Sequence, residues 1–559
     1  MFVYYYRNTK QKNRQYAVKR VRGSSYLAFV LWGCGGKSDN ARNSSDDNNT
    51  SGIITYYEPP TSDYTQPDGI DPNFKVLEPT FIEPYWIEAL QLSDYDSSIA
   101  VILEQYDRQI YYTFPELEPN YDLMDAVGWK AATPLMRIAA DEIFFGLNEV
   151  LNVDFISGDT LEGFNVIAIA RSKQIDTSGY SYFPSAYYEI GMDIYIGYDY
   201  SDPQYLNDKL TNYDYDVLVH EIGHALGLKH PFENHGDNEF KLNDYEDNTF
   251  HTVMSYNDDP QTFDGQFRSL DLMTLTKFYG VNPEYMAEDN FYRFSSSEGI
   301  FLIDGSGTDT IIAHDLIDNV TIDLRPGSHS FIGTKSEYIT DPYQLTISYE
   351  TDIENVFTGL GDDTVIGNLR NNEIKTSGGN DIIFPGEGSD VIITGPGMDQ
   401  IDLSEDVHSI DVIKFEKLII KDQGYDTIYG FVQGSYGDLF DVSDFINSLE
   451  MLPLVASYNV PEIDIGAGLL RVIGKDITTQ EQLSDALNEG GILEPLKLKD
   501  DECCIIVTAA NQSTGSSQSI FYAEKVGYEV SVDQIALVFG NALDIDAWHI
   551  ANFSHILIA

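Results

Sequence analysis

Three histidines, a glutamate and a glycine lie within eleven residues of this chain, in an order that suits metal chemistry. His220 and His224 are four residues apart, so on a helix their imidazoles share one face and can converge on one ion. Glu221 projects beside that face, where its carboxylate could polarise a metal-bound water. Gly227 can end the helix in a left-handed conformation and turn the chain back toward the ion. The turn brings in His230 as a third ligand, and the pattern therefore predicts a catalytic zinc site.

A second motif, residues 252–256, lies about two dozen residues downstream and contains Met254 and Tyr256. A zinc site of this type needs an apolar floor, although Met254 alone would be explained equally well as core filling. Together with residues 220–231, the motif resembles the metzincin metalloproteases, whose pattern is HExxHxxGxxH followed by a methionine-containing turn. The Met-Ser-Tyr ending is similar to that of the serralysin family. The resemblance implies that Met254 lies under the zinc, as a structural residue like Gly227. It also implies that Tyr256 ligates or approaches the zinc and stabilises an oxyanion.

By this resemblance the chain would be a zinc endopeptidase acting on protein or peptide substrates. His220, His224 and His230 would hold the zinc as neutral imidazoles, and Glu221 would take a proton from the attacking zinc-bound water. Tyr256 would move from the metal to the tetrahedral oxyanion. Two other hypotheses stay open: a calcium-dependent surface adhesin with an inactive protease domain, and a metzincin dedicated to one protein target.

A nine-residue period follows in the second half of the chain. Asp363, Asn372, Asp381, Asp390 and Asp399 are nine residues apart, and an apolar residue stands two positions after each. This matches the GGxGxDxUx repeat of calcium-binding parallel β-rolls. Glycines allow a tight turn whose carbonyls and aspartates offer hard oxygen ligands to Ca²⁺, and the apolar residue packs inside the roll. The residues predicted to bind calcium are Gly359, Gly361, Asp363, Gly379, Asp381, Gly386, Gly388, Asp390, Gly395, Gly397 and Asp399.

One window of this region departs from the repeat. Between Gly367 and Lys375 the expected Gly, Gly and Asp are replaced by Asn368, Arg370 and Asn372. The departure puts one calcium position in doubt. A degenerate earlier copy at residues 305–309 opens the same region.

The charge balance excludes some classes of partner. The chain of 559 residues has 33 Lys and Arg against 90 Asp and Glu, a formal net charge of −57. Nucleic acid and anionic membranes would be repelled by such a chain. The same acidity suits a protein whose folding is completed by calcium, and we expect both Zn²⁺ and Ca²⁺ as cofactors of a monomer.

The first residues suggest export. Residues 1–33 contain seven basic residues and no acidic one, and they end in a short apolar run that is too short to span a bilayer. Residues 31–34 resemble a bacterial lipoprotein box, which makes Cys34 a candidate for lipidation, although Trp32 fits that box poorly. A plain export signal, a misassigned start and a Cys34 that silences the zinc are the alternatives.

Composition and pattern divide the chain into five parts. We predict an export or lipoprotein signal at 1–33, a flexible polar linker at 34–76 and a metzincin domain at 77–290. A calcium-binding β-roll would follow at 291–448, and a β-rich C-terminal domain at 449–559. The predicted fold class is therefore an α+β catalytic domain, with a twisted sheet and helices, followed by an all-β parallel roll and further strands.

Helical spacing predicts a long amphipathic helix over 135–147, and β patterns predict strands at 153–156, 166–170 and 192–196. Residues 179–184 lie near the expected edge strand of the cleft, which in serralysins pairs with extended substrate, although an aromatic surface loop is an equal alternative. A helix that closes the domain should begin near Ser269, with Ser269 or Asp271 as its cap.

The last residues, from 544, are apolar and acidic, and they resemble the uncleaved signal read by a type I secretion channel. That signal and a lipoprotein box are competing export routes, so the expected location is extracellular, either secreted or lipid-anchored at a bacterial cell surface. Contact with a membrane would come only through the lipid anchor. The pair Cys503 and Cys504 has no role that the sequence defines, and three cysteines make no disulfide framework.

Overall fold

The fold is that of a computed structural model, which describes the chain from residue 84 to residue 553 with gaps. The predicted signal at 1–33, the linker at 34–76 and Cys34 lie outside the described residues. The described residues are 84–92, 95–118, 128–159, 163–173, 177–186, 191–198, 212–236, 238–257, 265–295, 299–415, 425–434, 436–442, 450–456, 463–465, 468–473, 477, 479–488, 493, 496–498, 503–509, 514–526, 529–544, 548 and 550–553.

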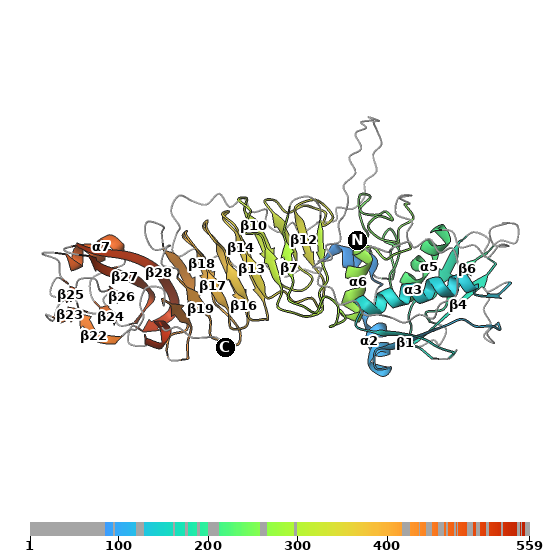
Figure 1. The fold of residues 1–559 in the computed structure, drawn as a ribbon, viewed down its shortest axis with the longest axis horizontal. Helices are drawn as coiled ribbons and strands as arrows, with labels where there is room; N and C mark the ends of the chain where they lie inside the picture. Colours follow the sequence, from blue (N-terminus) through green and yellow to red (C-terminus); the bar gives the residue numbers. More distant parts are fainter. Residues whose placement is uncertain are drawn as a thin grey trace, which may run out of the picture.

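Three parts follow one another along the long axis of the molecule (Figure 1). Helices and a small sheet form one end, stacked parallel strands form the middle, and a group of long strands with one helix forms the other end. The predicted fold class is confirmed by this arrangement, because an α+β part is followed by a parallel roll and then by further strands. No described helix has the length and the apolar character needed to cross a membrane.

The α+β part is built on a six-stranded twisted sheet with the order β3-β1-β4-β6-β5, in which β2 also pairs with β4. Strands β1, β3, β4 and β6 are parallel, and β5 lies antiparallel to β6 at the edge. The strands are β1 Gln109–Thr113, β2 Lys130–Ala131, β3 Asp154–Ser157, β4 Val166–Ser172, β5 Gly179–Ser181 and β6 Ile194–Gly197. The helices are α1 Tyr85–Leu90, α2 Tyr95–Gln105, α3 Pro134–Val150, α5 Asn212–Ala225 and α6 Ser269–Tyr279.

The predictions for this part are confirmed element by element. The amphipathic helix is α3, which begins with a proline after the capping residue Thr133, whose side chain accepts a hydrogen bond from the backbone of Met136. The three predicted strands are β3, β4 and β6, and the predicted edge strand is β5. The closing helix does begin at Ser269, but Arg268 occupies the N-cap position, and the Asp271 carboxylate accepts a hydrogen bond from its backbone N–H.

The middle part is a roll in which successive strands from β12 to β21 alternate between two sheets. Strands β10, β14, β16, β18 and β20 belong to one sheet, and β7, β9, β13, β15, β17, β19 and β21 form the other. Because each repeat of nine residues makes one strand, partners within a sheet are 18 residues apart, as in the pairing of Val365 with Ile383 and of Ile383 with Ile401. These three side chains are fully buried, so the predicted packing of the apolar position inside the roll is confirmed.

The strands of this part start nine residues apart from β13 to β18, as the repeat predicts, and are less regularly spaced before and after. They are β7 Phe291–Arg293, β8 Ile300–Leu302, β9 Thr310–Ile312, β10 Val320–Asp323, β11 His329–Ile332, β12 Gln344–Ile347, β13 Asn355–Phe357, β14 Thr364–Asn368, β15 Glu373–Lys375, β16 Ile382–Gly386, β17 Val391–Ile393, β18 Gln400–Asp402, β19 Val412–Lys414, β20 Asp426–Tyr429 and β21 Leu439–Asp441.

The last strands continue one sheet of the roll, because β28 pairs in parallel with β20. At this end of the roll the rings of Phe431, Phe440, Trp548 and Phe553 pack together. The predicted boundary at residue 449 stays a prediction, but hydrogen-bonded strands join the two sides of it. The elements are β22 Glu450–Ala456, β23 Ile463–Ile465, β24 Gly468–Ile473, α7 Gln480–Leu487, β25 Leu496–Leu498, β26 Cys503–Ala509, β27 Thr514–Val526, β28 Glu529–Asp544 and the short 3₁₀ helix η2 Ile550–Phe553.

The α+β part and the roll share a packed joint. Phe301, Ile303 and Ile339 from the roll belong to the hydrophobic core of the α+β part. The buried carboxylate of Glu246 accepts hydrogen bonds from the Tyr85 hydroxyl at 2.6 Å and from the Thr340 hydroxyl at 2.9 Å. Residues on both sides thus satisfy one buried acceptor, so the two parts pack as neighbours with a defined geometry.

Candidate metal centre

Helix α5 and the turn after it position the three histidines. His220 and His224 lie one turn apart on α5, which ends at Ala225. Gly227 has a φ of +107°, a backbone conformation that favours glycine, so the predicted turn is confirmed. The Leu228 N–H bonds back to the Gly223 carbonyl at 2.9 Å, closing the turn and sending the chain toward His230.

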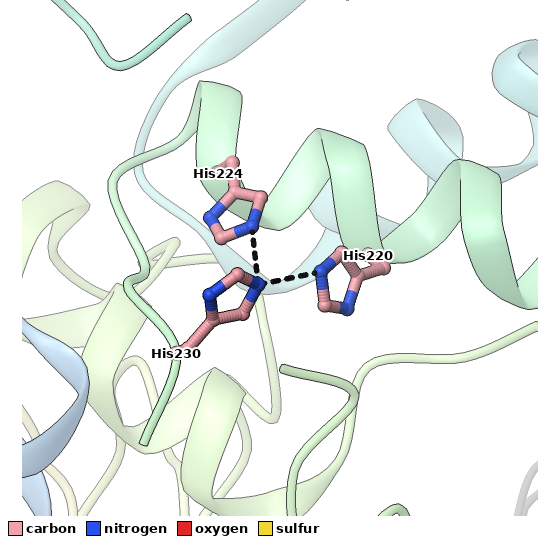
Figure 2. Close-up of side chains that lie close together, drawn as sticks. All are labelled: His220, His224 and His230. Atoms are coloured by element: carbon pink, nitrogen blue, oxygen red, sulfur yellow. Dashed lines mark hydrogen bonds between the residues drawn. The ribbon is translucent and has the colours of Figure 1, made fainter. Parts of the chain in front are cut away.

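Figure 2 shows the three imidazoles facing one another. Nε2 of His230 lies 3.2 Å from Nε2 of His220 and 3.1 Å from Nε2 of His224. Nδ1 of His220 lies 2.7 Å from the Val253 carbonyl, and Nδ1 of His224 lies 2.7 Å from the Leu228 carbonyl. Because a carbonyl can only accept, each of these Nδ1 atoms carries the proton of a neutral ring, and each Nε2 is left with a lone pair.

The third ring is oriented in the same way by a carboxylate. Nδ1 of His230 lies 2.9 Å from Oε2 of Glu233, which directs its Nε2 lone pair at the other two rings. Burial lowers the pKa of His220 to about 4 and holds that of His224 well below its usual value, so these rings stay neutral. Three lone pairs that point at one another need a cation between them.

The geometry of these nitrogens suits zinc. A tetrahedral zinc with bonds of about 2.0–2.1 Å separates two nitrogen ligands by about 3.3–3.4 Å. The observed contacts of 3.1 and 3.2 Å are close to that separation. Among the described residues, His220, His224 and His230 form the one group of three or more candidate ligands whose atoms lie within 4.8 Å of one another.

Glu221 lies beside this group in a buried position. Burial raises the pKa of its carboxyl to about 8, and its Oε2 has no hydrogen-bond partner within the described part of the chain. A side chain added at Gly179 on strand β5 would place its Cβ 2.8 Å from Oε1 of Glu221, so the edge strand passes directly against the carboxylate. A divalent cation nearby would favour the ionised form, which is the form that can accept a proton.

Met254 packs against helix α5 at Gly223 and is fully buried, and its place under a zinc ion stays a prediction. A Cβ added to Gly223 would lie 2.6 Å from the Met254 sulfur, so the sulfur packs into space that only a glycine leaves open. The position of Gly223 inside a helix, where glycine costs stability relative to alanine, was the signal in the sequence for this close approach.

Asp271 of α6 holds the turn that carries Met254. Its carboxylate accepts hydrogen bonds from the Thr252 hydroxyl at 2.6 Å and the Val253 N–H at 2.9 Å. The Val253 carbonyl in turn holds the His220 ring at 2.7 Å. The structural role predicted for Asp271 therefore reaches the metal centre through one intervening residue.

Tyr256 lies on the open side of the centre. Its ring centroid is 4.6 Å from that of His230 and 5.8 Å from that of His220, and the side chain is 63% exposed. Phe232, which the sequence did not single out, stacks on His230 with an interplanar angle of 8° and contacts Tyr256 at 4.9 Å. The two aromatic rings border the side from which a substrate could enter.

The predicted calcium turns form ladders of aspartates. Oδ1 of Asp381 accepts a hydrogen bond from the Asp363 N–H, and Oδ1 of Asp399 accepts one from the Asp381 N–H, each at 2.8 Å. One oxygen of each carboxylate thus connects neighbouring turns. The other oxygen, Oδ2, is buried without a hydrogen-bond partner, within the described residues, in Asp363, Asp381, Asp390 and Asp399. Orphaned carboxylate oxygens next to glycine turns suit a hard cation such as Ca²⁺.

The glycines let successive turns stack closely. A Cβ on Gly397 would lie 1.7 Å from the carbonyl oxygen of Gly379, and one on Gly379 would lie 2.0 Å from that of Gly361. A side chain at any of these positions would therefore collide with the turn below, which explains the strict repeat.

In the window 367–375, which departs from the repeat, side-chain amides close the turn by donating hydrogen bonds to backbone carbonyls. The Asn368 amide donates to the Leu324 carbonyl at 3.1 Å and the Ile353 carbonyl at 2.9 Å, and the Asn372 amide donates to the Glu354 carbonyl at 2.9 Å. Three carbonyls that face the turn are thus satisfied by N–H groups of the chain itself. This geometry agrees with the doubt that the sequence placed on a calcium ion here.

Two family patterns match the chain at these places. The pattern described as metallo-peptidase family M12B, reprolysin-like, matches residues 197–273, and the RTX calcium-binding nonapeptide repeat, in four copies, matches residues 357–392. The chain thus combines a reprolysin-like metallopeptidase domain with RTX calcium-binding repeats. These two classes imply zinc and calcium as the metals.

Several curated proteins are similar to the chain. A serralysin of Proteus mirabilis is 28% identical over 304 residues, which cover 48% of this chain and 60% of the relative. Serralysin C of Dickeya chrysanthemi is 30% identical over 34% of this chain and 43% of the relative, and metallopeptidase AprA of Pseudomonas marginalis is 30% identical over 41% and 53%. The chain thus spans about half the length of the curated relatives that it matches.

The close packing at Gly223 generates one prediction. Gly223→Ala should lower the free energy of unfolding by about 1–3 kcal/mol, because the new methyl group overpacks the space that the buried Met254 fills. Gly146→Ala is the control, since nothing lies within 4 Å of a Cβ there, and alanine in helix α3 should add about 0.5–1 kcal/mol. Thermal unfolding measures both variants, and equal effects would contradict the proposed packing.

The aspartate ladders generate a prediction about pH. Without calcium, burial raises the pKa of Asp381 and Asp390 to about 8 from the usual 3.8, so the folded chain holds these protons more tightly than the unfolded chain. The stability of the calcium-free roll should therefore be greatest below about pH 4 and fall as the pH rises toward 8. Excess calcium should remove this loss, because it binds the ionised carboxylates.

Circular dichroism melts at pH 4, 6 and 8 test this, on protein freed of calcium and then supplied with zinc. Asp381→Asn should weaken the pH dependence of the calcium-free sample. A melting temperature that is the same with and without calcium at pH 8 would refute the calcium assignment.

Proposed function

We propose that this chain is a zinc endopeptidase that hydrolyses peptide bonds in protein substrates. The single observation that carries the proposal is that Nε2 of His230 lies within 3.2 Å of Nε2 of both His220 and His224, next to the buried Glu221, whose Oε2 has no hydrogen-bond partner among the described residues. An adhesin with an inactive domain would have no need of that carboxylate. The match to a reprolysin-like pattern and the similarity to serralysins point the same way.

His220, His224 and His230 would hold the zinc, and Glu221 would handle the proton. When bound, zinc polarises a substrate carbonyl and lowers the pKa of a water molecule at the site. Glu221 would accept a proton from an attacking water molecule while the oxygen of that water bonds to the peptide carbon, and it would then donate the proton to the leaving amine. Burial raises the pKa of its carboxyl to about 8 in the metal-free chain, and a zinc ion beside it would lower that pKa and leave the carboxylate ionised to accept the proton.

Strand β5 is the proposed docking edge for the substrate. It is the last strand of its sheet, and Gly179 on it lies against Glu221. An extended peptide that paired with β5 would carry its carbonyls past the carboxylate and the three histidines. Tyr256 stands on the open side, where its hydroxyl can donate to the oxyanion that forms on the attacked carbonyl.

The calcium-binding repeats support an extracellular location, because calcium is abundant there and scarce in cytosol. The aspartates Asp363, Asp381, Asp390 and Asp399, with the glycines of their turns, would bind the calcium ions that complete the roll. We propose secretion, through a type I channel or a lipoprotein route, and a monomeric protease. A metzincin with one dedicated protein target is the second candidate, because the Phe232 ring stacks on His230 and contacts Tyr256, where it could select among substrate side chains.

Glu221→Ala should retain zinc and lose the cleavage of casein by at least about 100-fold, since a general base contributes about 10²–10⁴-fold. Zinc content by atomic absorption and casein hydrolysis are the measurements. Glu239→Ala is the control, because Glu239 is exposed on the loop after His230, and it should leave both unchanged. Full activity of the Glu221 variant would exclude the mechanism.

Tyr256→Phe removes the hydroxyl and keeps the ring against His230. It should lower kcat by about 10²-fold with little change in KM or zinc content, because an oxyanion donor acts mainly on the transition state. Tyr245→Phe serves as the matched control, since Tyr245 is similarly exposed and stacks on Tyr338 of the roll. Steady-state kinetics on a peptide substrate decide, and an unchanged kcat would remove Tyr256 from the mechanism.

A further inference from the structure

Helix α1 ends against the loop that carries the third histidine, residues 229–241. The last four carbonyls of a helix have no partner within the helix. Here two residues of the loop satisfy all four. The side chain of Asn238 donates to the carbonyls of Glu88 at 2.7 Å and Gln91 at 2.9 Å. Lys229 donates to the remaining two, from its N–H to Leu90 at 2.8 Å and from Nζ to Ala89 at 2.6 Å.

The Lys229 ammonium is buried among carbonyls. The residue is 2% exposed, and Nζ donates to the Glu233 and Phe240 carbonyls at 2.9 Å each, in addition to Ala89. Nζ also lies 3.4 Å from the His230 carbonyl. A charge is costly to bury unless hydrogen bonds replace its hydration, and the three shorter contacts match the three N–H bonds of an ammonium. One side chain therefore joins α1 to both ends of the loop.

This cluster leads directly to a metal ligand. Lys229 fixes the backbone of Glu233, and the Glu233 carboxylate accepts the hydrogen bond from Nδ1 of His230 at 2.9 Å. His220 and His224 are held by helix α5, whereas His230 lies beyond the turn and has no helix to place it. The position of the third ring thus depends on what anchors residues 229–233.

We propose that Lys229 is a positioning residue of the metal centre, which holds His230 in place by clamping its loop to the C-terminal end of α1. The ammonium acts as a built-in cation that is bound by backbone carbonyls of helix α1 and of the loop. Asn238 completes the clamp from the other end of the loop. The inference rests on the proposed zinc site. It adds that helix α1, which lies outside the HExxH motif, contributes to the affinity of the centre for its metal by holding the third ligand in place.

Cobalt binding tests the proposal on the full chain. Co²⁺ in a site with histidine ligands has visible absorption that depends on the number and geometry of the ligands. Lys229→Met keeps the length and apolar stem of the side chain but removes the ammonium. We expect its Co²⁺ dissociation constant to rise by about 10–100-fold, as for the loss of other residues that orient a ligand. Its spectrum at saturation should move toward that of His230→Ala.

Lys241→Met is the matched control, because Lys241 is exposed on the same loop and should bind Co²⁺ as the wild type does. A role in stability alone would lower the melting temperature of Lys229→Met and leave the saturated spectrum unchanged, which would overturn the proposal. If Lys229→Met does not fold by circular dichroism, Asn238→Ala decides. It removes the bonds to Glu88 and Gln91, and it should weaken Co²⁺ binding in the same direction, whereas wild-type affinity would overturn the proposal.

The wild type separates this inference from the proposed function. If the wild type and His230→Ala give the same Co²⁺ affinity and spectrum, the three-histidine centre itself is wrong. If they differ and Lys229→Met behaves like the wild type, the centre stands and the clamp is refuted.

Discussion

Three imidazole rings converge in this molecule, with Nε2 of His230 within 3.2 Å of Nε2 of both His220 and His224, and the surrounding structure serves to hold them there. Neutral rings at that distance repel unless a cation lies between them, and each ring is prevented from turning away by an acceptor on its Nδ1 atom. Those acceptors come from the methionine turn, from the turn at Gly227 and from the loop after His230. The helix, the glycine turn, the buried methionine and the clamp on α1 are therefore parts of one arrangement.

The same physical problem recurs in the roll, where buried carboxylate oxygens take the place of imidazole nitrogens. Among the described residues, Asp381 and Asp390 each have one oxygen without a hydrogen-bond partner, and burial raises the pKa of both carboxyls because no cation balances their charge. At two places the chain supplies its own donors. The Lys229 ammonium fills a cluster of carbonyls beside the zinc site, and the Asn368 amide closes the aberrant turn of the roll. In each of these places the buried hydrogen-bond acceptors outnumber the donors, and a metal ion or an N–H group of the chain itself would balance them.

The α+β part and the roll are also joined by hydrogen bonds to one buried carboxylate. Glu246 lies on the loop between His230 and Met254, and its buried carboxylate binds Thr340 of the roll and Tyr85 of helix α1. Helix α1 therefore contacts the metal-site loop at its end and the roll at its beginning. The α+β part and the roll are therefore joined by a buried hydrogen-bond network as well as by a shared apolar core.

The histidine spacing, the turn at Gly227, the nine-residue period and the one aberrant repeat can all be predicted from the sequence, because each follows from contacts within about one helical or roll turn. Helix α3, strands β3, β4 and β6 and the buried isoleucines were predictable from periodicity for the same reason. Three contacts are visible only in the folded chain: Gly223 makes room for Met254, Asp271 holds the turn behind His220, and Lys229 ties His230 to α1. These contacts join residues from 18 to 140 positions apart, with the Gly223–Met254 pair between those limits, and the folded backbone alone brings such residues together.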